Sequence, residues 1–216
     1  MANYSKVYDK SFKKIDIYKK YPQLLPWVGS KYDKQKSKLL IIGESHYLPP
    51  HIKYHKDPDL WYSSNINELR KRDDQDQEAD QWIDTRGVID FAIENNYKLK
   101  GHTIYKNIDL AYKEIVNSNE HIFSNIAFYN YFLRPAEKTG ESIKVSKLDR
   151  KISNSIFEKI TKILKPDFVM FLSTKSWDHC DILGYDGEIE TPGMNYIFDF
   201  SCHPTSKWWN KKSKQY

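Results

Sequence analysis

Reactive side chains cluster directly after a short apolar run near residue 40. The segment "LLIIGESHY" passes from four aliphatic residues through Gly43 to an acid, a hydroxyl, an imidazole and a phenol. In chain order these are Glu44, Ser45, His46 and Tyr47. Such groups serve in acid–base catalysis, nucleophilic attack and hydrogen bonding. Because a short apolar run is typical of a buried strand, the sequence predicts a chemically active loop at a strand end.

Three later segments repeat this arrangement of an apolar run and polar side chains. They are "HIFSNIAFYNYFLRP", "DFVMFLSTKSW" and "NYIFDFSCHPTS". Their polar groups are Asn130 in the first, Ser173, Thr174 and Lys175 in the second, and His203, Thr205 and Ser206 in the third. Ligands of parallel sheets bind outside the carboxyl ends of the strands. We therefore expect all four segments to lie along one edge of a sheet.

The elements that position these groups alternate between strand and helix patterns. The apolar runs predict strands at 39–42, 125–132, 167–173 and 195–201. Helical spacing of apolar residues predicts helices from Thr85 to the Asn-Asn pair at 95–96, over 104–117 and over 146–166. This order indicates a three-layer α/β/α fold with a central, largely parallel four-stranded sheet.

The chain is expected to form a single domain over residues 1–216. An N-terminal segment, 1–38, wraps the core, the α/β core spans 39–206, and 207–216 is a basic tail. The net charge of +5 permits a polyanionic partner without requiring one. No long apolar run and no apolar signal core are present, so we expect a cytoplasmic protein without membrane association. The oligomeric state is open, with a monomer as the default expectation.

Several common kinds of site fit the sequence poorly. A Ser-His-acid hydrolase would use Ser45, but "GESHY" lacks the G-x-S-x-G elbow, and adjacent Ser45 and His46 project in different directions. The histidines of "HYLPPHIKYH" lie in a proline-containing loop without metal-ligand spacing, so no metal is expected. The two cysteines lack the C-x-x-C pattern of zinc and redox sites. The usual nucleotide-binding glycine motifs are also missing, and no cofactor is expected.

Taken in order, the four segments resemble the uracil-DNA glycosylase superfamily. In that family a first strand leads into a Gly-containing catalytic loop, a second delivers a base-reading Asn, a third ends in a small polar loop, and the last ends in a His-Pro-Ser motif. Here "IIGESHY", "FYNYFLRP", "LSTKSW" and "HPTS" occupy these places, over roughly residues 27–210, as order and spacing rather than extended identity. The carboxylate of the first motif, Glu44, lies one residue before the position that several members fill with Asp or Asn.

The resemblance implies a role for each matched residue. Glu44 and His203 are the candidate catalytic residues: Glu44 stabilises the cationic sugar and orients water, and His203 donates to the departing base. Asn130 reads the base edge, and Tyr47 is the ring that excludes a thymine methyl group. Ser45 and His46 complete the expected base-binding group. The implied activity is removal of uracil or another altered base from DNA by hydrolysis of the N-glycosidic bond.

DNA is the partner that this resemblance implies. A glycosylase extrudes its target base and contacts the flanking phosphates. The candidate DNA-binding residues are Ser173, Thr174, Lys175, Thr205, Ser206, Lys207, Trp208 and Trp209. Either tryptophan would serve as wedge or stacking surface, and the lysines would meet phosphate. The alternative is a catalytically inactive relative of the same fold that binds nucleic acid, a nucleobase or a protein partner.

Overall fold

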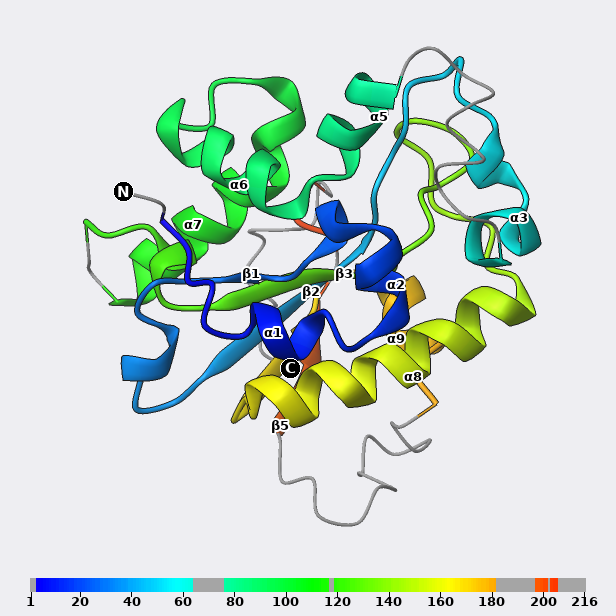
Figure 1. The fold of residues 1–216 in the computed structure, drawn as a ribbon. Helices are drawn as coiled ribbons and strands as arrows, with labels where there is room; N and C mark the ends of the chain where they lie inside the picture. The colour runs from blue at the N-terminus through cyan, green and yellow to red at the C-terminus, as the bar shows by residue number, and fades with distance from the viewer. Residues whose placement is uncertain (1–2, 64–75, 117–118, 182–196, 202, 206–216) are drawn as a thin grey trace, which may run out of the picture.

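A five-stranded sheet forms the centre of the protein. The computed structural model describes residues 3–63, 76–116, 119–181, 197–201 and 203–205. The strands are β1 (Trp27–Val28), β2 (Leu39–Ser45), β3 (Ala127–Phe132), β4 (Phe168–Phe171) and β5 (Ile197–Phe200), in the spatial order β1-β3-β2-β4-β5 (Figure 1). β2, β3, β4 and β5 are parallel, whereas β1 pairs antiparallel with β3. The predicted α/β class and largely parallel sheet are therefore confirmed.

Two details of the predicted sheet were wrong. The sheet has a fifth strand, β1, which is only two residues long and follows Pro26, so it carries no alternation pattern that a sequence can show. β2 continues past its predicted end at Ile42, because Gly43 and Ser45 remain paired with β3. Glu44 therefore lies near the end of a β-strand and not in a loop. Its backbone is fixed because Gly43 and Ser45, on either side of it, are paired with β3.

The alternation of side chains along the strands divides the core into two apolar clusters. Leu40 and Ile42 of β2 pack in the cluster that includes α8 (Lys147–Leu164), together with Tyr129 of β3. Ile41 and Phe128 belong to the other cluster. Successive residues of a strand point to opposite faces, so each face of the sheet buries its own set. Figure 1 shows α8 on one side of the sheet and α6 and α7 on the other.

Eight α-helices occur in the described part of the chain. They are α1 (Asp9–Phe12), α2 (Asp16–Lys20), α3 (Pro58–Ser63), α5 (Asp76–Ile83), α6 (Thr85–Glu94), α7 (Thr103–Val116), α8 and α9 (Thr174–Asp178). Short 3₁₀ turns are η1 (Pro22–Leu24), η2 (Tyr32–Lys34), η3 (Tyr54–Lys56), η4 (Lys100–His102) and η5 (Ile122–Ser124). The predicted helices correspond to α6, α7 and α8 and are confirmed. None of the described helices combines the length and the apolar character needed to cross a membrane.

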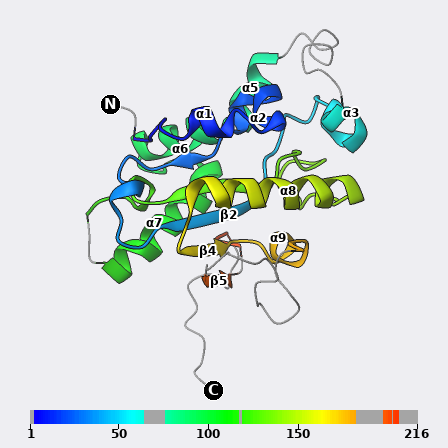
Figure 2. The ribbon, with the colours of Figure 1, turned by 60° about the horizontal axis from the view of Figure 1, so that its bottom comes forward.

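The longest helix, α8, begins and ends at residues whose chemistry sets its bounds. Ser146 accepts the N–H of Asp149, and Asp149 accepts the N–H of Ser146, which is a capping box. At the other end Lys165 adopts a left-handed conformation with φ 48°, and Pro166 cannot continue the helix. Figure 2 shows α8 running along the sheet, with α9 following β4. Asp149 consequently lies at the end of α8 that approaches the carboxyl edge of the sheet.

Candidate functional site

The carboxyl ends of the parallel strands bring several of the singled-out residues together. Gly43 on β2 lies opposite Asn130 on β3. On the other side of β2, the N–H of Leu172 donates to the carbonyl of Ile42, and beyond it the N–H of Ser201 donates to that of Phe171. Each strand therefore ends at the same edge. The segments that carry Glu44, Asn130, Ser173 and His203 leave the sheet side by side.

The Glu44 carboxylate is held by three hydrogen bonds. Ser173 Oγ donates to Oε2 at 2.7 Å, and Ser142 Oγ donates to the same oxygen at 3.2 Å. The backbone N–H of Ile143 donates to Oε1 at 3.2 Å. Both oxygens thus have partners, and the half-buried carboxylate has one orientation. Ser142 and Ile143 were not expected at this site, since they lie in the β3–α8 loop (residues 133–146), outside every motif.

Asn130 presents an amide with unused hydrogen-bonding capacity. Its side chain is buried and makes no hydrogen bond with any residue that the structure describes. The amide lies directly over Gly43, because a Cβ built there would come within 2.2 Å of Asn130 Oδ1. The donor and acceptor of Asn130 are therefore free for a ligand at the same edge as Glu44.

The contact between Gly43 and Asn130 makes a sharp prediction. Replacing Gly43 with Ala forces the Asn130 amide out of its place, because the new methyl group and Oδ1 cannot both fit. We expect a loss of about 1–3 kcal/mol in the free energy of unfolding, as for other overpacked positions. Urea unfolding measures it. Gly101→Ala is the matched control, since no atom lies within 4 Å of a Cβ at that position; equal effects for the two would contradict the prediction.

His203 follows β5 and is fixed by its own loop. Its Nδ1 accepts the backbone N–H of Thr205 at 3.3 Å and lies 2.7 Å from Thr205 Oγ1. A ring nitrogen that accepts carries no proton, so the neutral imidazole bears its hydrogen on Nε2. Burial lowers the pKa of His203, and the charge of Glu44 opposes this with a smaller upward effect. His203 is thus a neutral Nε2–H donor within the electrostatic range of Glu44.

A hydrogen bond joins the loop that carries His203 to α7, on the opposite side of the sheet from α8. Asn107 on α7 donates to the carbonyl of Pro204 at 2.5 Å. Pro204 is buried and Thr205 is exposed. The hydroxyl of Thr205 is used in holding His203 and the residue still reaches solvent, as a phosphate contact would require. The other predicted residues of this motif and of the tail, Ser206, Lys207, Trp208 and Trp209, lie outside the described residues.

The remaining residues of the first motif separate into two environments. Tyr47 is half-buried, and burial and the charge of Glu44 both raise the pKa of its hydroxyl. His46 is buried, with Nε2 at 3.0 Å from Thr85 Oγ1 at the start of α6. Ser45 is half-buried at the end of β2. The Tyr47 hydroxyl therefore responds to the charge of Glu44, whereas the imidazole of His46 packs against α6.

The burial of His46 predicts a pH dependence of stability. Burial lowers the pKa of His46 to about 4. The unfolded chain, with a value near 6.5, binds more protons between these two pH values, so stability falls as the pH falls through this window. Between pH 7.5 and 4.5 we expect His46 to account for about 2–3 kcal/mol of lost stability. Urea unfolding of His46→Gln at both pH values should show a loss smaller by this amount; an identical loss would contradict it.

Two of the three polar residues of the third motif, Ser173 and Lys175, bond to Glu44 and to the loop beside it. Ser173 is buried, accepts a hydrogen bond from the N–H of Ser176 as the N-cap of α9, and donates a hydrogen bond from its hydroxyl to Glu44. Lys175 donates through Nζ to the carbonyl of Ile143 at 2.9 Å. Thr174 is exposed. Of the three residues singled out for DNA contact, Thr174 alone presents a side chain that is both exposed and without another hydrogen bond among the described residues.

Metal binding and similarity to known proteins give no further guidance. In the described ranges no three His, Cys, Asp or Glu side chains lie close enough together to hold a metal ion. Comparison with protein-family models finds no match to this chain. Comparisons with curated proteins and with solved structures likewise find no significant similarity. The function must therefore be argued from the geometry at the carboxyl edge of the sheet.

Proposed function

We propose that the protein is a DNA glycosylase of the uracil-DNA glycosylase type, with that superfamily's three-layer α/β/α arrangement. It removes uracil or another altered base from DNA by hydrolysing the N-glycosidic bond. The observation that carries the proposal is the shared carboxyl end of β2 and β3, where Gly43 lies opposite Asn130: the residue after Gly43, Glu44, presents a fixed carboxylate, and Asn130 presents a buried, unbonded amide. One group suits a developing cation and the other suits the hydrogen-bonding edge of a base.

The chemistry follows from where charge develops. As the glycosidic bond breaks, its electron pair leaves with the base and the sugar becomes oxocarbenium-like. Glu44 stabilises the positive sugar, and its orientation is preset by three donors, so no reorganisation is needed during the reaction. Water then bonds to the anomeric carbon and passes one proton to the Glu44 carboxylate, from which solvent or the departed base anion takes it up. His203, with its hydrogen on Nε2, donates to an oxygen of the departing anion.

Recognition of the base rests on Asn130 and Tyr47. The Asn130 amide offers one acceptor and two donors, which match the alternating edge of a pyrimidine. The half-buried Tyr47 ring, three residues after Glu44 in the chain, forms the wall that selects base size. Because a base inside a duplex cannot reach such an edge, the enzyme extrudes its target nucleotide, and the partner is DNA. The net charge of +5 favours approach to phosphate.

A base-release assay tests the proposal. Purified protein is incubated with labelled single-stranded and double-stranded oligonucleotides that each contain one uracil or one other altered base, and abasic sites are cleaved with alkali. We expect strand cleavage with at least one substrate and none with the unmodified oligonucleotide. If none of the altered bases is released from either single-stranded or double-stranded oligonucleotides, the proposed enzymatic activity is wrong. Binding without release would instead favour the inactive relative that binds nucleic acid or a nucleobase.

A further inference from the structure

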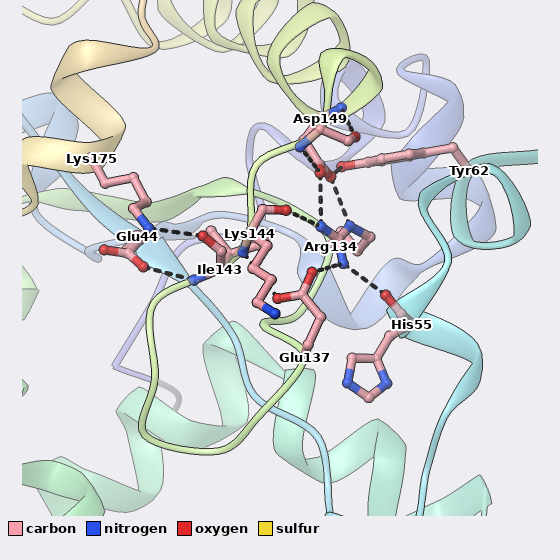
Figure 3. A network of polar contacts seen from close by, with 10 residues as sticks. Glu44, His55, Tyr62, Arg134, Glu137, Ile143, Lys144, Asp149 and Lys175 are labelled. Carbon is pink, nitrogen blue, oxygen red and sulfur yellow. Dashed lines mark hydrogen bonds and ion pairs between the residues drawn. The ribbon is translucent and has the colours of Figure 1, made fainter.

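Arg134 lies at the centre of a buried network near the candidate site. Its guanidinium has five N–H donors, and each has a partner. Nε and Nη2 donate to the two carboxylate oxygens of Asp149 at 2.9 and 2.8 Å, and Nη1 donates to Glu137 at 2.8 Å. The carbonyls of His55 and Lys144 accept the other two at 2.9 Å (Figure 3). Arg134 and Asp149 have no exposed side-chain surface, so neither can touch DNA.

Side chains bond to the backbone of two consecutive residues, Ile143 and Lys144, from opposite sides. The carbonyl of Lys144 accepts from Arg134, and its N–H donates to Glu137 Oε2 at 2.9 Å. The preceding residue is bonded on the other side: the N–H of Ile143 donates to Glu44, and the carbonyl of Ile143 accepts from Lys175. Figure 3 shows Ile143 and Lys144 between Glu44 and Arg134. All four backbone groups of these two residues are thus bonded to side chains.

The geometry points to Arg134 and Glu137 as positioning residues for Glu44. They act through Lys144 and Ile143, and the inference rests on the proposed role of Glu44 in base release. A carboxylate at the end of a strand can rotate about its side-chain torsions unless its partners are immobile. Here one partner is a backbone N–H in a loop, and loops hold position poorly without such support. The buried arginine supplies that support and makes the loop part of the catalytic geometry.

Glu137→Gln is the sharpest test, because substitution of the wholly buried Arg134 endangers folding. Glu137 is 18% exposed, and Gln keeps its size but cannot accept from both Arg134 and Lys144 with its two ends. Glu141→Gln is the matched control: the same change in the same loop, at a residue 59% exposed that pairs with Lys138 alone. For Glu137→Gln we expect kcat for base release to fall by about tenfold to a hundredfold with KM little changed. Glu141→Gln should match the unaltered protein.

A double-variant cycle separates positioning from a general loss of structure. In the background of Glu44→Gln, where no carboxylate remains to be oriented, Glu137→Gln should cause no further loss of base release. A further loss of the same size there would overturn the inference.

Amide hydrogen exchange provides a readout that does not depend on activity. The N–H of Ile143 should exchange about tenfold faster or more in Glu137→Gln than in Glu141→Gln, because the loop that presents it to Glu44 is loosened. If no base is released from any oligonucleotide, the proposed function fails while this measurement still decides the positioning. Unchanged exchange at Ile143 would overturn the positioning, whatever the activity.

Discussion

Replacing Glu44 with Gln should lower the rate of base release by about 100- to 1000-fold. Gln has the size of Glu and retains an oxygen that can accept the Ile143 N–H, while the hydroxyls of Ser142 and Ser173 can turn to accept from its amide. The fold should therefore survive. What disappears is the negative charge that stabilises the developing sugar cation in the mechanism we propose. Single-turnover assays on the best oligonucleotide substrate measure the rate.

Two neighbouring groups report whether the charge at Glu44 has been removed as intended. The charge of Glu44 raises the pKa of both Tyr47 and His203. In Glu44→Gln both values should therefore fall, which NMR titration of the two rings would detect. Glu141→Gln, an exposed carboxylate of the β3–α8 loop, is the control for both the rate and the titrations. A full rate in Glu44→Gln, together with the expected shifts, would remove Glu44 from the mechanism.

Replacing Arg134 with Met should destabilise the protein by about 3–5 kcal/mol. The change leaves Asp149 wholly buried with its charge unpaired, and it also frees the carbonyls of His55 and Lys144. Burial alone would raise the pKa of Asp149, but the bonds from Arg134 and from the Ser146 backbone hold it below its usual value. Loss of Arg134 removes the larger part of that compensation. Urea or thermal unfolding measures the effect.

An exposed arginine on α8, directly after Asp149 in the chain, provides the comparison. Arg150 pairs with Asp181, and both side chains are about half exposed, so Arg150→Met should cost less than about 1 kcal/mol. The double variant Arg134→Met with Asp149→Asn removes the unpaired charge and should recover part of the lost stability. A cost for Arg134→Met no larger than that for Arg150→Met would show that the network contributes little to folding.

The Arg134 and Glu44 variants test different properties: the stability of the fold and the proposed chemistry at the site. Arg134 holds the β3–α8 loop through Glu137 and the carbonyl of Lys144, and Glu44 accepts a hydrogen bond from that loop. Stability should respond to Arg134 and hardly to Glu44, while the rate of base release should respond to both. Gly43 lies between these cases, because its missing Cβ leaves room for the Asn130 amide. Measuring stability and rate for all three distinguishes support of the site from chemistry at the site.

The sequence by itself determined the α/β class, the four parallel strands and the helices α6, α7 and α8. Helical and strand periodicities arise from burial of one face, and that burial is written locally in the apolar residues. The same pattern placed Glu44, Asn130, Ser173 and His203 at strand ends. The shared carboxyl edge followed from parallel pairing. The capping box at Ser146 and Asp149, which the structure revealed, is also local, because its two residues are three positions apart in the chain.

The tertiary structure alone decided which of these polar residues have partners and which remain available. His46 was grouped with Glu44 as a site residue, yet its ring is buried against Thr85. Ser173 was grouped with Lys175 as a DNA contact, yet its hydroxyl donates a hydrogen bond to Glu44. No local pattern marks Ser142, Ile143 or Arg134, because their contacts join segments far apart in the chain and depend on how the β3–α8 loop folds back. Hydrogen bonds of this kind carry no period, so only the packed chain assigns them.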